Sequence, residues 1–448
     1  MTIWPIHPAD NATPEALNAF LLKCRAAAQH DGRAKLVSIS LAVEALDPLA
    51  VLESIFDPQQ PHFYAERPAM QTAIAGAEVA LACTAHGPDR FATVQRWIAD
   101  TLQHTIAVGD VSAPFGGPHF FNSFAFHDEV EPGEPFAAAY CFVPSWQVAL
   151  AGKMTTAVAN LVVTPDADLT ALALRVWRAH QKFRGFGFQE PPSVAPAPSP
   201  ALHFTRREAG DYQVTVSRGL ERIKQGEFAK IVLARAQDLT ADRALHPLEM
   251  LNGLRQRFPD CYAFSFTAGR GPSFIGASPE QLVRVSQGRL ETEALAGSIR
   301  RGATASEDAA LGAALLRSEK DRREHRQVLD DIVARLAPLG IQPAYPEHPY
   351  VRRLANVQHL HTPVTAALPA GVSILQVVAA MHPTPAVGGS PRQAAVARIR
   401  ELEGFPRGLY AGALGWTNAR GGGEFFVGIR SAVIAGASAR LFAGAGIV

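Results

Sequence analysis

The chain has 448 residues, 48% of them hydrophobic, which is enough to bury a large core. It carries 42 basic and 41 acidic side chains, and this balance excludes the strongly basic surface that is typical of a nucleic-acid-binding protein. The four cysteines have no paired spacing that would indicate a disulfide framework or a zinc site, so a reducing cytoplasm fits best.

The start of the chain lacks a basic segment followed by an apolar core, and no apolar run approaches the roughly 20 residues that span a bilayer, so we expect a soluble, cytoplasmic protein with no membrane partner.

The N-terminal segments predict a sheet with helices packed on it. Thr13 and Pro14 are typical of a helix start, and the amphipathic segment after them runs to about residue 30. Strands are expected at residues 36–43, 137–143 and 158–164.

A proline-rich stretch, residues 189–200, follows this part of the chain. Its prolines cannot donate to a sheet ladder or continue a helix, so we place a boundary or surface crossing there, between residues 1–200 and residues 201–448. Beyond it, residues 212–225 carry apolar side chains at helical spacing. Gly226 suits the left-handed position that ends a helix, and a strand follows at once.

The remaining elements predict a second long helix and several strands. The helix is expected from about Ser306, where Glu307 and Asp308 favour the macrodipole, to Pro338, which ends it. Strands are expected at residues 351–362, 412–417 and 424–433, with a hairpin turn at 418–423 between the last two.

Lys230 and Glu280 are the most informative pair of residues. Lys230 precedes the apolar residues 231–234, which favour a central strand, where desolvation lowers the pKa of a lysine from about 10.4 until it can act as a base. The alternative is a lysine on a sheet edge with its ammonium in water. Glu280 follows a Ser-Pro turn, and the alternative for it is a carboxylate that caps the backbone there. One base and one acid are what adding water while expelling hydroxide requires, so the pair indicates an enzyme.

Three acidic residues mark one face of the second long helix. Asp321 and Glu324 are three apart, with Asp331 near the same stripe, so carboxylate oxygens could be presented to a hard cation. The alternative is a solvated face, because the basic residues interleaved with these acids would form surface ion pairs.

Two other patterns point away from a zinc or nucleotide site. His359 and His361 are two apart on a predicted strand and face the same side, but no third soft ligand stands nearby in the sequence. The glycine-rich segments 421–423 and 444–446 lack the order of strand, G-x-G-x-x-G and helix, and also the Gly-Lys-Ser/Thr of a phosphate loop. We therefore expect neither zinc nor a nucleotide cofactor.

The segments from about residue 205 to 448 resemble the chorismate-utilising enzymes, the family of isochorismate, salicylate, anthranilate and aminodeoxychorismate synthases. Residues 1–200 resemble the family's variable N-terminal part only loosely, whereas residues 201–448 resemble its chorismate-binding catalytic region. The resemblance implies an α+β fold like that of anthranilate synthase component I, with two large, mainly antiparallel sheets facing each other and helices outside. The motifs that carry it are Lys230-Ile-Val-Leu-Ala-Arg235, Gly276-Ala-Ser-Pro-Glu280, Glu293-Ala-Leu-Ala-Gly-Ser298, Ser318-Glu-Lys-Asp-Arg-Arg-Glu-His325, His382-Pro-Thr-Pro-Ala-Val-Gly-Gly389, Arg407-Gly-Leu-Tyr-Ala-Gly412 and Phe442-Ala-Gly-Ala-Gly-Ile447.

The resemblance also implies a role for each site residue. Lys230 would be the general base that deprotonates water for attack at C2 of chorismate, and Glu280 the acid that protonates the departing C4 hydroxyl. Glu324 would hold Mg2+, the implied cofactor, which would anchor the ring carboxylate and, as a nearby positive charge, help to keep the lysine neutral. The other implied substrate-binding residues are Tyr410, Arg430 and the amides near Gly444 around the enolpyruvyl carboxylate, with Ser298, His359 and Ala386 lining the pocket.

Within the family, three positions distinguish the branches. Ammonia-using members typically replace the lysine at the position of Lys230, and aminodeoxychorismate synthases carry a nucleophilic lysine at the position of Ala296, so both branches are disfavoured. The small Ala386 favours isochorismate synthase over salicylate synthase, which adds pyruvate elimination and stays open as the alternative. Whether the product would serve menaquinone or siderophore biosynthesis also stays open.

The family continues beyond the position of Val448 with an acidic segment that supplies a second metal-binding glutamate, so we expect that the sequence omits a C-terminal tail. Asp321 is the next candidate ligand within the chain. An alternative from another class is a catalytically silent protein that binds a small dicarboxylate. With no partner motif in the sequence, we expect a monomer.

Overall fold

The computed structural model describes residues 1–4, 13–184 and 202–448. The helices are α1 (Pro14–Asp31), α2 (Pro48–Ser54), α3 (Arg90–Gln103), α4 (Leu169–Arg184), α5 (Tyr212–Lys224), α6 (Pro247–Arg257), α7 (Ala305–Arg317), α8 (Glu319–Leu336), α9 (Ile374–Met381) and α10 (Arg392–Glu403), with the short 3-10 turns η2 (Pro68–Met70) and η3 (Ala337–Leu339). The strands are β1 (Thr2–Ile3), β2 (Lys35–Val43), β3 (Pro61–Arg67), β4 (Thr72–Ala85), β5 (Thr105–Gly109), β6 (His119–Phe124), β7 (Ala139–Ala151), β8 (Met154–Val163), β9 (Phe204–Ala209), β10 (Lys230–Ala241), β11 (Tyr262–Ala268), β12 (Ser273–Ser278), β13 (Gln281–Ser286), β14 (Arg289–Arg300), β15 (Tyr350–Arg353), β16 (Val357–Ala367), β17 (Gly389–Ser390), β18 (Ala413–Asn418), β19 (Gly423–Val427), β20 (Ser431–Ala435) and β21 (Ser438–Ile447).

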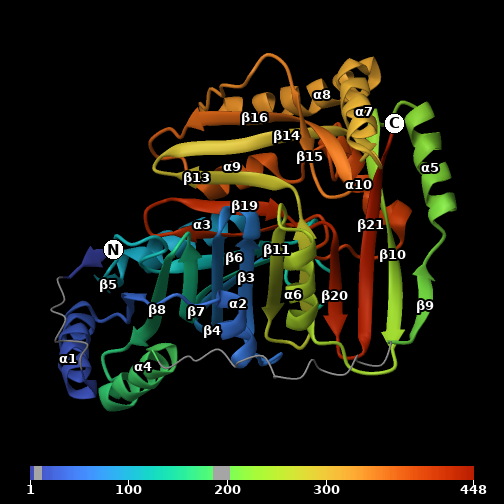
Figure 1. The fold of residues 1–448 in the computed structure, drawn as a ribbon. Coiled ribbons are helices and arrows are strands. Elements are labelled where there is room, and N and C mark those ends of the chain that lie inside the picture. The colour runs from blue at the N-terminus through green and yellow to red at the C-terminus, as the bar shows by residue number, and fades with distance from the viewer. Residues whose placement is uncertain (5–12, 185–201) are drawn as a thin grey trace.

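Apart from β17, a two-residue strand that pairs with the start of β10, these strands form two layers that are joined through β7 (Figure 1). The first layer has the hydrogen-bonded order β1-β5-β2-β8-β7-β4-β3-β11-β12-β20-β21-β10-β9, and the second has the order β6-β18-β19-β13-β14-β16-β15. The start of β7 pairs with β6 and its end pairs with β8, so this strand belongs to both layers. Within the described residues, the strand pairs are antiparallel except for β1–β5 and β2–β5. The arrangement therefore agrees with the two mainly antiparallel sheets that the sequence predicts.

An aromatic core fills the space between the two layers. Alternate residues of β11 point to opposite sides, as the two-residue period of a strand requires. Phe264 and Phe266 of the first layer lie in one cluster with Phe121 and Phe426 of the second, and the Phe264 and Phe426 ring centroids are 5.0 Å apart. Ala263 belongs instead to the cluster under α2 and α6. This strand is buried on both faces because a sheet covers one face and helices cover the other.

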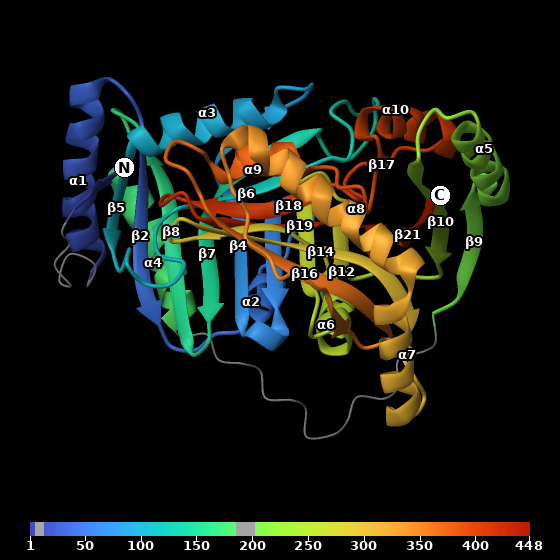
Figure 2. The same cartoon turned by 90° about the horizontal axis from the view of Figure 1, so that it is seen from above.

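Helices cover the outer faces of the layers. Figure 1 shows α2 and α6 in front of β3, β4 and β11, and α1 and α4 at the end formed by β5 and β8. Seen from above in Figure 2, α3 lies on the side away from α2, and α8 runs diagonally across β14 and β16. The apolar residues of α3, α8 and α9 join the largest core cluster. The helices therefore lie outside the pair of sheets, as the resemblance implies.

Local sequence signals place several elements correctly. The Thr13 hydroxyl accepts a hydrogen bond from the Ala16 N–H, Pro14 opens α1, and Gly32 ends the helix in a left-handed conformation. The helix predicted at 212–225 is α5, which ends just before Gly226 with φ +75°. The turn at 418–423 joins β18 and β19 as an antiparallel hairpin, which confirms that prediction.

The prediction of one long helix from Ser306 to Pro338 is wrong, because two helices, α7 and α8, meet at Ser318. Ser318 has an extended conformation, its N–H donates to the Ala314 carbonyl, and its hydroxyl accepts a hydrogen bond from the Asp321 N–H. A serine that can cap the next helix competes with helix continuation at this position.

Strand boundaries also differ from the expected ones. The segment 351–362 is divided between β15 and β16, and the segment 424–433 is divided between β19 and β20 by a break that contains Arg430 at φ +52°. The strand expected at 137–143 begins at Ala139 and continues to Ala151. An apolar run alone does not show where the chain leaves one pairing for the next.

The proline-rich stretch 189–200 lies outside the described residues, so the division of the chain into residues 1–200 and 201–448 stays a prediction. Among the described helices, none has the length and apolar character needed to cross a bilayer.

Candidate active site

Lys230 is the first residue of β10 and is only 9% exposed. At this end β10 has neighbours on both sides, because Lys230 pairs with Ser390 of β17 and Ile231 pairs with Ile447 of β21. The amine donates to Glu324 Oε1 of α8 over 3.1 Å. The alternative of an edge-strand lysine with its ammonium in water is therefore wrong.

Glu280 lies in the turn between β12 and β13. The Ser278 hydroxyl accepts the Glu280 N–H over 3.3 Å, so the serine rather than the Glu280 carboxylate caps this turn. The carboxyl group accepts a hydrogen bond from the Thr384 hydroxyl, also over 3.3 Å. Burial raises the pKa of Glu280 to about 7, and nearby Glu293 adds to this, whereas the hydrogen bond from Thr384 and the charge of Lys230 act in the opposite direction. The group can therefore hold a proton near neutral pH.

The loop of residues 382–390 connects the Lys230 and Glu280 parts of the site. Its Thr384, which is 8% exposed, bonds to Glu280, and its Ser390 pairs with Lys230. Ala386 lies between them and is partly buried. One short segment thus brings the amine and the carboxyl group to the same site, and their charges interact.

Strand β21 brings its glycines against two site residues. A Cβ atom at Gly444 would lie 2.6 Å from the Tyr410 hydroxyl oxygen, and one at Gly446 would lie 3.1 Å from Lys230 Cε. Tyr410 is buried, and this raises its pKa to about 12, so its hydroxyl is a neutral donor. Side chains at either glycine would push against the groups that the sequence assigns to the site.

Ser298 and His359 lie opposite each other on β14 and β16, with 2.7 Å between Ser298 Oγ and His359 Nδ1. Gly297, at φ +76°, makes the bulge that sets this register. Burial lowers the pKa of His359 to about 4, and the charges of Arg430 and Arg352 lower it further, so the ring is neutral. Among the described residues, His359 Nε2 is buried without a hydrogen-bond partner.

Arg430 holds a left-handed backbone conformation, which costs a residue with a side chain roughly 1–2 kcal/mol. Its carbonyl accepts the Ala277 N–H over 3.2 Å, and this bond helps to keep the conformation. The positive charge of the guanidinium helps to lower the pKa of His359, so it acts on this part of the site. Strain of this kind is often found where a side chain must be aimed at a ligand.

The two predicted metal ligands differ in how free they are. Glu324 has a side chain that is 35% exposed and makes one bond, to Lys230, so its carboxylate fits the preference of Mg2+ for oxygen ligands. The Asp321 carboxylate accepts the Ser318 hydroxyl, and its Cβ lies against Gly297. Both residues stay predicted ligands, with Glu324 the better fit.

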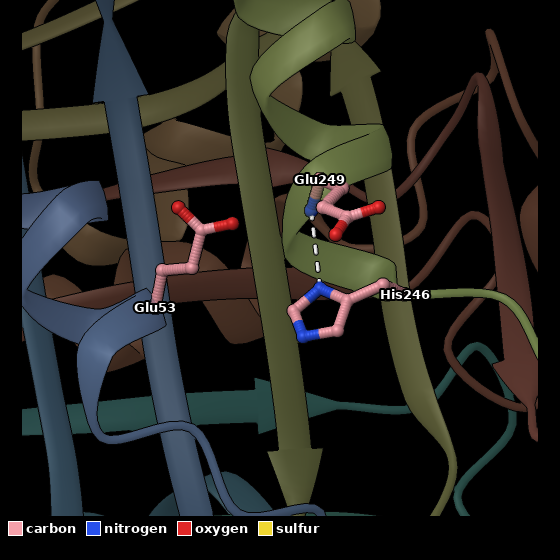
Figure 3. A group of neighbouring side chains, drawn as sticks. All are labelled: Glu53, His246 and Glu249. Carbon is pink, nitrogen blue, oxygen red and sulfur yellow. Dashed lines mark hydrogen bonds between the residues drawn. The ribbon is translucent and has the colours of Figure 1, made fainter. Parts of the chain in front are cut away.

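A separate Glu-His-Glu group lies on the outer surface between α2 and α6. Glu53, His246 and Glu249 each offer an atom within 4.8 Å of the others, and within the described residues this is the group of three that could hold an ion (Figure 3). However, His246 Nδ1 accepts the Glu249 N–H and caps α6, whose N-terminus is the positive end of the helix. These contacts favour a helix cap over a metal site.

Sequence reasoning gave no role to Thr384 or Glu293. Glu293 accepts bonds from Arg352, over 2.8 Å, and from His361, over 2.6 Å, and these partners lower its pKa although burial acts in the opposite direction. His359 and His361 thus have different partners, Ser298 and Glu293 respectively. Strand β14 also carries Glu291 and Thr292, so no local pattern in the sequence singled out Glu293.

Comparison with known proteins shows what the chain as a whole is similar to. Residues 19–448 match the family model described as chorismate binding enzyme. The chain is 36% identical to the salicylate biosynthesis isochorismate synthase of Pseudomonas aeruginosa, over 94% of this chain and 87% of that protein. It is 30% identical to the isochorismate synthase MenF of Bacillus subtilis, over 94% of this chain and 90% of that protein.

Solved structures give the same result for the fold. The menaquinone-specific isochorismate synthase MenF of Escherichia coli matches with a TM-score of 0.75 and 26% identity, over 95% of this chain and 94% of that chain. Anthranilate synthase component I of Streptococcus pneumoniae matches with a TM-score of 0.66 and 21% identity, over 84% of this chain and 87% of that chain. The predicted fold class is confirmed.

Proposed function

The chain belongs to the family of chorismate-binding enzymes, and from that premise we propose that it is an isochorismate synthase. The observation that carries the proposal is the pairing of a buried amine, Lys230, with a carboxyl group, Glu280, that can hold a proton at neutral pH. The relatives from Pseudomonas aeruginosa and Bacillus subtilis, whose matches cover most of both chains, carry the name isochorismate synthase, which favours this member of the family.

The proposed reaction replaces the hydroxyl at C4 of chorismate by one at C2. The amine of Lys230 acts as the base and takes a proton from water as the water oxygen bonds to C2, and both ring double bonds shift, from C1=C2 to C1=C6 and from C5=C6 to C4=C5. The C4–O bond breaks, and Glu280 gives its proton to the departing hydroxyl, which leaves as water. Lys230 ends protonated and Glu280 ionised, so proton exchange with solvent restores both groups for the next turnover.

The other site residues would bind and orient the substrate. Chorismate is a dianion, and Arg430 supplies positive charge on one side of the site. The neutral Tyr410 hydroxyl beside Gly444 offers a donor to a carboxylate. The neutral His359 ring, fixed by Ser298 at Nδ1, presents Nε2 to a substrate oxygen. Placement by several fixed groups accounts for much of the rate that such a site can achieve.

Mg2+ is the cofactor that we propose, with Glu324 as its ligand and Asp321 as a second candidate. When bound, the ion would supply positive charge against the ring carboxylate of the substrate. Glu324 also contacts Lys230, so this residue would connect the metal position with the base.

Replacing Glu324 with glutamine is expected to raise the Mg2+ concentration for half-maximal activity by at least about tenfold, because even outer contacts of metal ligands are worth 10- to 100-fold in affinity. Mg2+ titrations of activity and of thermal stability in the presence of chorismate measure the change. Glu319→Gln, at an exposed position of the same helix, is the matched control. Equal Mg2+ dependence of both variants and the wild type would remove Glu324 from the metal site.

The pH dependence of kcat/KM should show the titration of Glu280, the proposed acid. Because Glu280 must carry its proton to act, kcat/KM for chorismate is expected to fall about tenfold for each pH unit above the Glu280 pKa of about 7. Initial rates between pH 6 and 9 at saturating Mg2+ measure this limb. A value of kcat/KM that stays constant up to pH 9 would contradict the assignment of Glu280 as the acid.

Incubating the protein with chorismate and Mg2+ and separating the products tests the function itself. Isochorismate as the main product is the expected result. Salicylate would assign the chain to the alternative, salicylate synthase, and anthranilate would contradict both. Tight chorismate binding by calorimetry without turnover would instead support the silent dicarboxylate-binding protein.

A further inference from the structure

A buried ion pair lies directly behind the candidate site, and the proposed reaction gives it no role. Glu403 is the last residue of α10, and Arg407 follows it by four residues. Their side chains are 0% and 1% exposed, respectively. Arg407 Nε donates to Glu403 Oε2 over 2.9 Å, and Arg407 Nη2 donates to Glu403 Oε1. Within the described part of the chain no other ion pair between a carboxylate and an arginine is buried to this degree.

The pair bonds to the backbone of the strand that carries Lys230. Arg407 Nη2 donates to the Val232 carbonyl over 2.7 Å, and Glu403 Oε1 accepts the Ala234 N–H over 2.7 Å. Val232 and Ala234 lie two and four residues after Lys230, so both contacts are close to the lysine end of the strand. The ion pair therefore holds β10 at two positions near Lys230, in addition to the strand's neighbours in the sheet.

The same guanidinium also bonds to the loop that carries Thr384. Arg407 Nη1 donates to the Val387 carbonyl over 3.0 Å. The Val387 N–H donates to the Thr384 carbonyl over 3.1 Å, and the Val232 N–H donates to the Gly388 carbonyl over 3.0 Å. Arg407, the strand and the loop thus form a closed ring of hydrogen bonds, and this ring sets the distance between the Lys230 and Thr384 segments.

Tyr410 is the third segment in contact with this arginine. Its N–H donates to the Arg407 carbonyl over 2.9 Å, and the guanidinium carbon lies 5.7 Å from the Tyr410 ring centroid. The same carbon lies 4.2 Å over the ring of Phe126, a cation–π contact that helps to hold the guanidinium. The Arg407 side chain therefore contacts the strand of Lys230, the loop of Thr384 and the ring of Tyr410.

Stability alone does not require an ion pair at this position. Burying two charges is costly, and well-packed apolar residues of similar volume are often as stable as a buried pair. What apolar residues cannot supply is a rigid planar fork whose donors reach three carbonyl or carboxylate groups in fixed directions. The geometry of the contacts, rather than their energy, is therefore the property that this site needs.

We propose that Arg407, held in place by Glu403, is a positioning residue that sets the separation between Lys230, Thr384 and Tyr410. This inference rests on the proposed function, because it concerns the same site. Arg407 itself would touch neither the substrate nor the reacting atoms. It would act by keeping Lys230 and Glu280 in the right positions relative to the substrate.

Arg407→Lys is the test variant, and Arg440→Lys is the matched control. Arg440 binds Asp238 through two bonds of 2.7 and 2.9 Å and also joins β21 to β10, but at the end of the strands away from Lys230. We expect Arg407→Lys to lower kcat by roughly 100-fold, as misplacement by about 1 Å can do, while KM changes only a few-fold. Arg440→Lys is expected to keep the wild-type kcat.

A second readout separates positioning from general loss of structure. Thr384 lowers the pKa of Glu280, while Glu293 and burial raise it and Lys230 lowers it. In Arg407→Lys the loop of residues 382–390 loses a contact, so the hydrogen bond from Thr384 to Glu280 is expected to weaken and the pKa of Glu280 to rise. The alkaline limb, which is the fall of kcat/KM at high pH, should then move to higher pH. A variant that is only less stable would keep the wild-type limb.

Wild-type kcat and an unchanged limb in folded Arg407→Lys would overturn the inference, as would an equal loss in Arg440→Lys. If Arg407→Lys does not fold, Glu403→Gln decides, because it keeps the shape and removes the charge: a lower kcat with the same limb shift supports positioning, and a wild-type kcat overturns it. Failure of both variants to fold would overturn it too, since the pair would then serve the core. Wild-type protein that forms no isochorismate would instead contradict the proposed function.

Discussion

Replacing Lys230 with alanine is expected to lower kcat for isochorismate formation by roughly 10³- to 10⁴-fold, at the upper end of what one general base contributes. The alanine leaves no group to take the proton from water, and the nearest other side chain in contact, Glu324, is the proposed metal ligand. Product formation from chorismate at saturating Mg2+ measures the effect. Circular dichroism and thermal unfolding check that the fold is kept.

The matched control for this variant is Lys35→Ala. Lys35 is also a buried lysine at the first position of a strand and pairs with a carboxylate, Asp31, but it lies in β2, at the other end of the first layer. It should keep the wild-type kcat even if its stability falls. Normal activity in folded Lys230→Ala would remove Lys230 from the mechanism.

Signals within a few residues predicted part of the fold well. Thr13, Pro14 and the residues before Gly226 identify the ends of α1 and α5, because the groups that satisfy a helix terminus lie next to it in the chain. The same local logic failed at Ser318. A serine inside a charged run fits a helix interior or a cap, and the choice depends on α8 packing across β14.

The candidate site depends on contacts over long separations in the sequence. Lys230 and Glu324 are 94 residues apart, and Glu280 and Thr384 are 104 apart. The residues indicated a base on a strand and an acid on a turn, and the family resemblance assigned them to one site. No sequence spacing shows that the 382–390 loop bonds to Glu280, because that contact follows from the register of β10 with β17.

The sequence likewise carries no sign that the pair Glu403–Arg407 is buried at the site. Four residues apart at the end of a helix, the pair has the spacing of an ordinary surface ion pair. Only the strand and loop packed over it, through Val232 and Val387, make it part of the site.

Replacing Glu280 with glutamine is the second large effect that we expect. Glutamine has nearly the shape of glutamic acid and can still accept the Thr384 hydroxyl, but it has no proton to give to the departing hydroxyl. Loss of a general acid lowers rates by about 10²- to 10⁴-fold, so kcat should fall by that factor. The limb of kcat/KM above pH 7 should disappear with it. Glu66→Gln, at a partly buried glutamate that bonds to Tyr64 and Arg255, is the control and should keep wild-type kinetics.

The same substitution should stabilise the protein at alkaline pH, and this separates a lost acid from a damaged fold. The pKa of Glu280 rises from 4.5 to about 7 on folding, so its contribution is fully present below pH 4.5 and is lost as pH rises through 7. Glutamine does not titrate, so at pH 8 Glu280→Gln should exceed the wild type in unfolding free energy by an amount on the order of 1–3 kcal/mol, with little difference at pH 4. Denaturant unfolding at both pH values measures this. An inactive variant that is less stable than the wild type at pH 8 would mean that Glu280 serves the fold, and the proposed acid would have to be sought elsewhere.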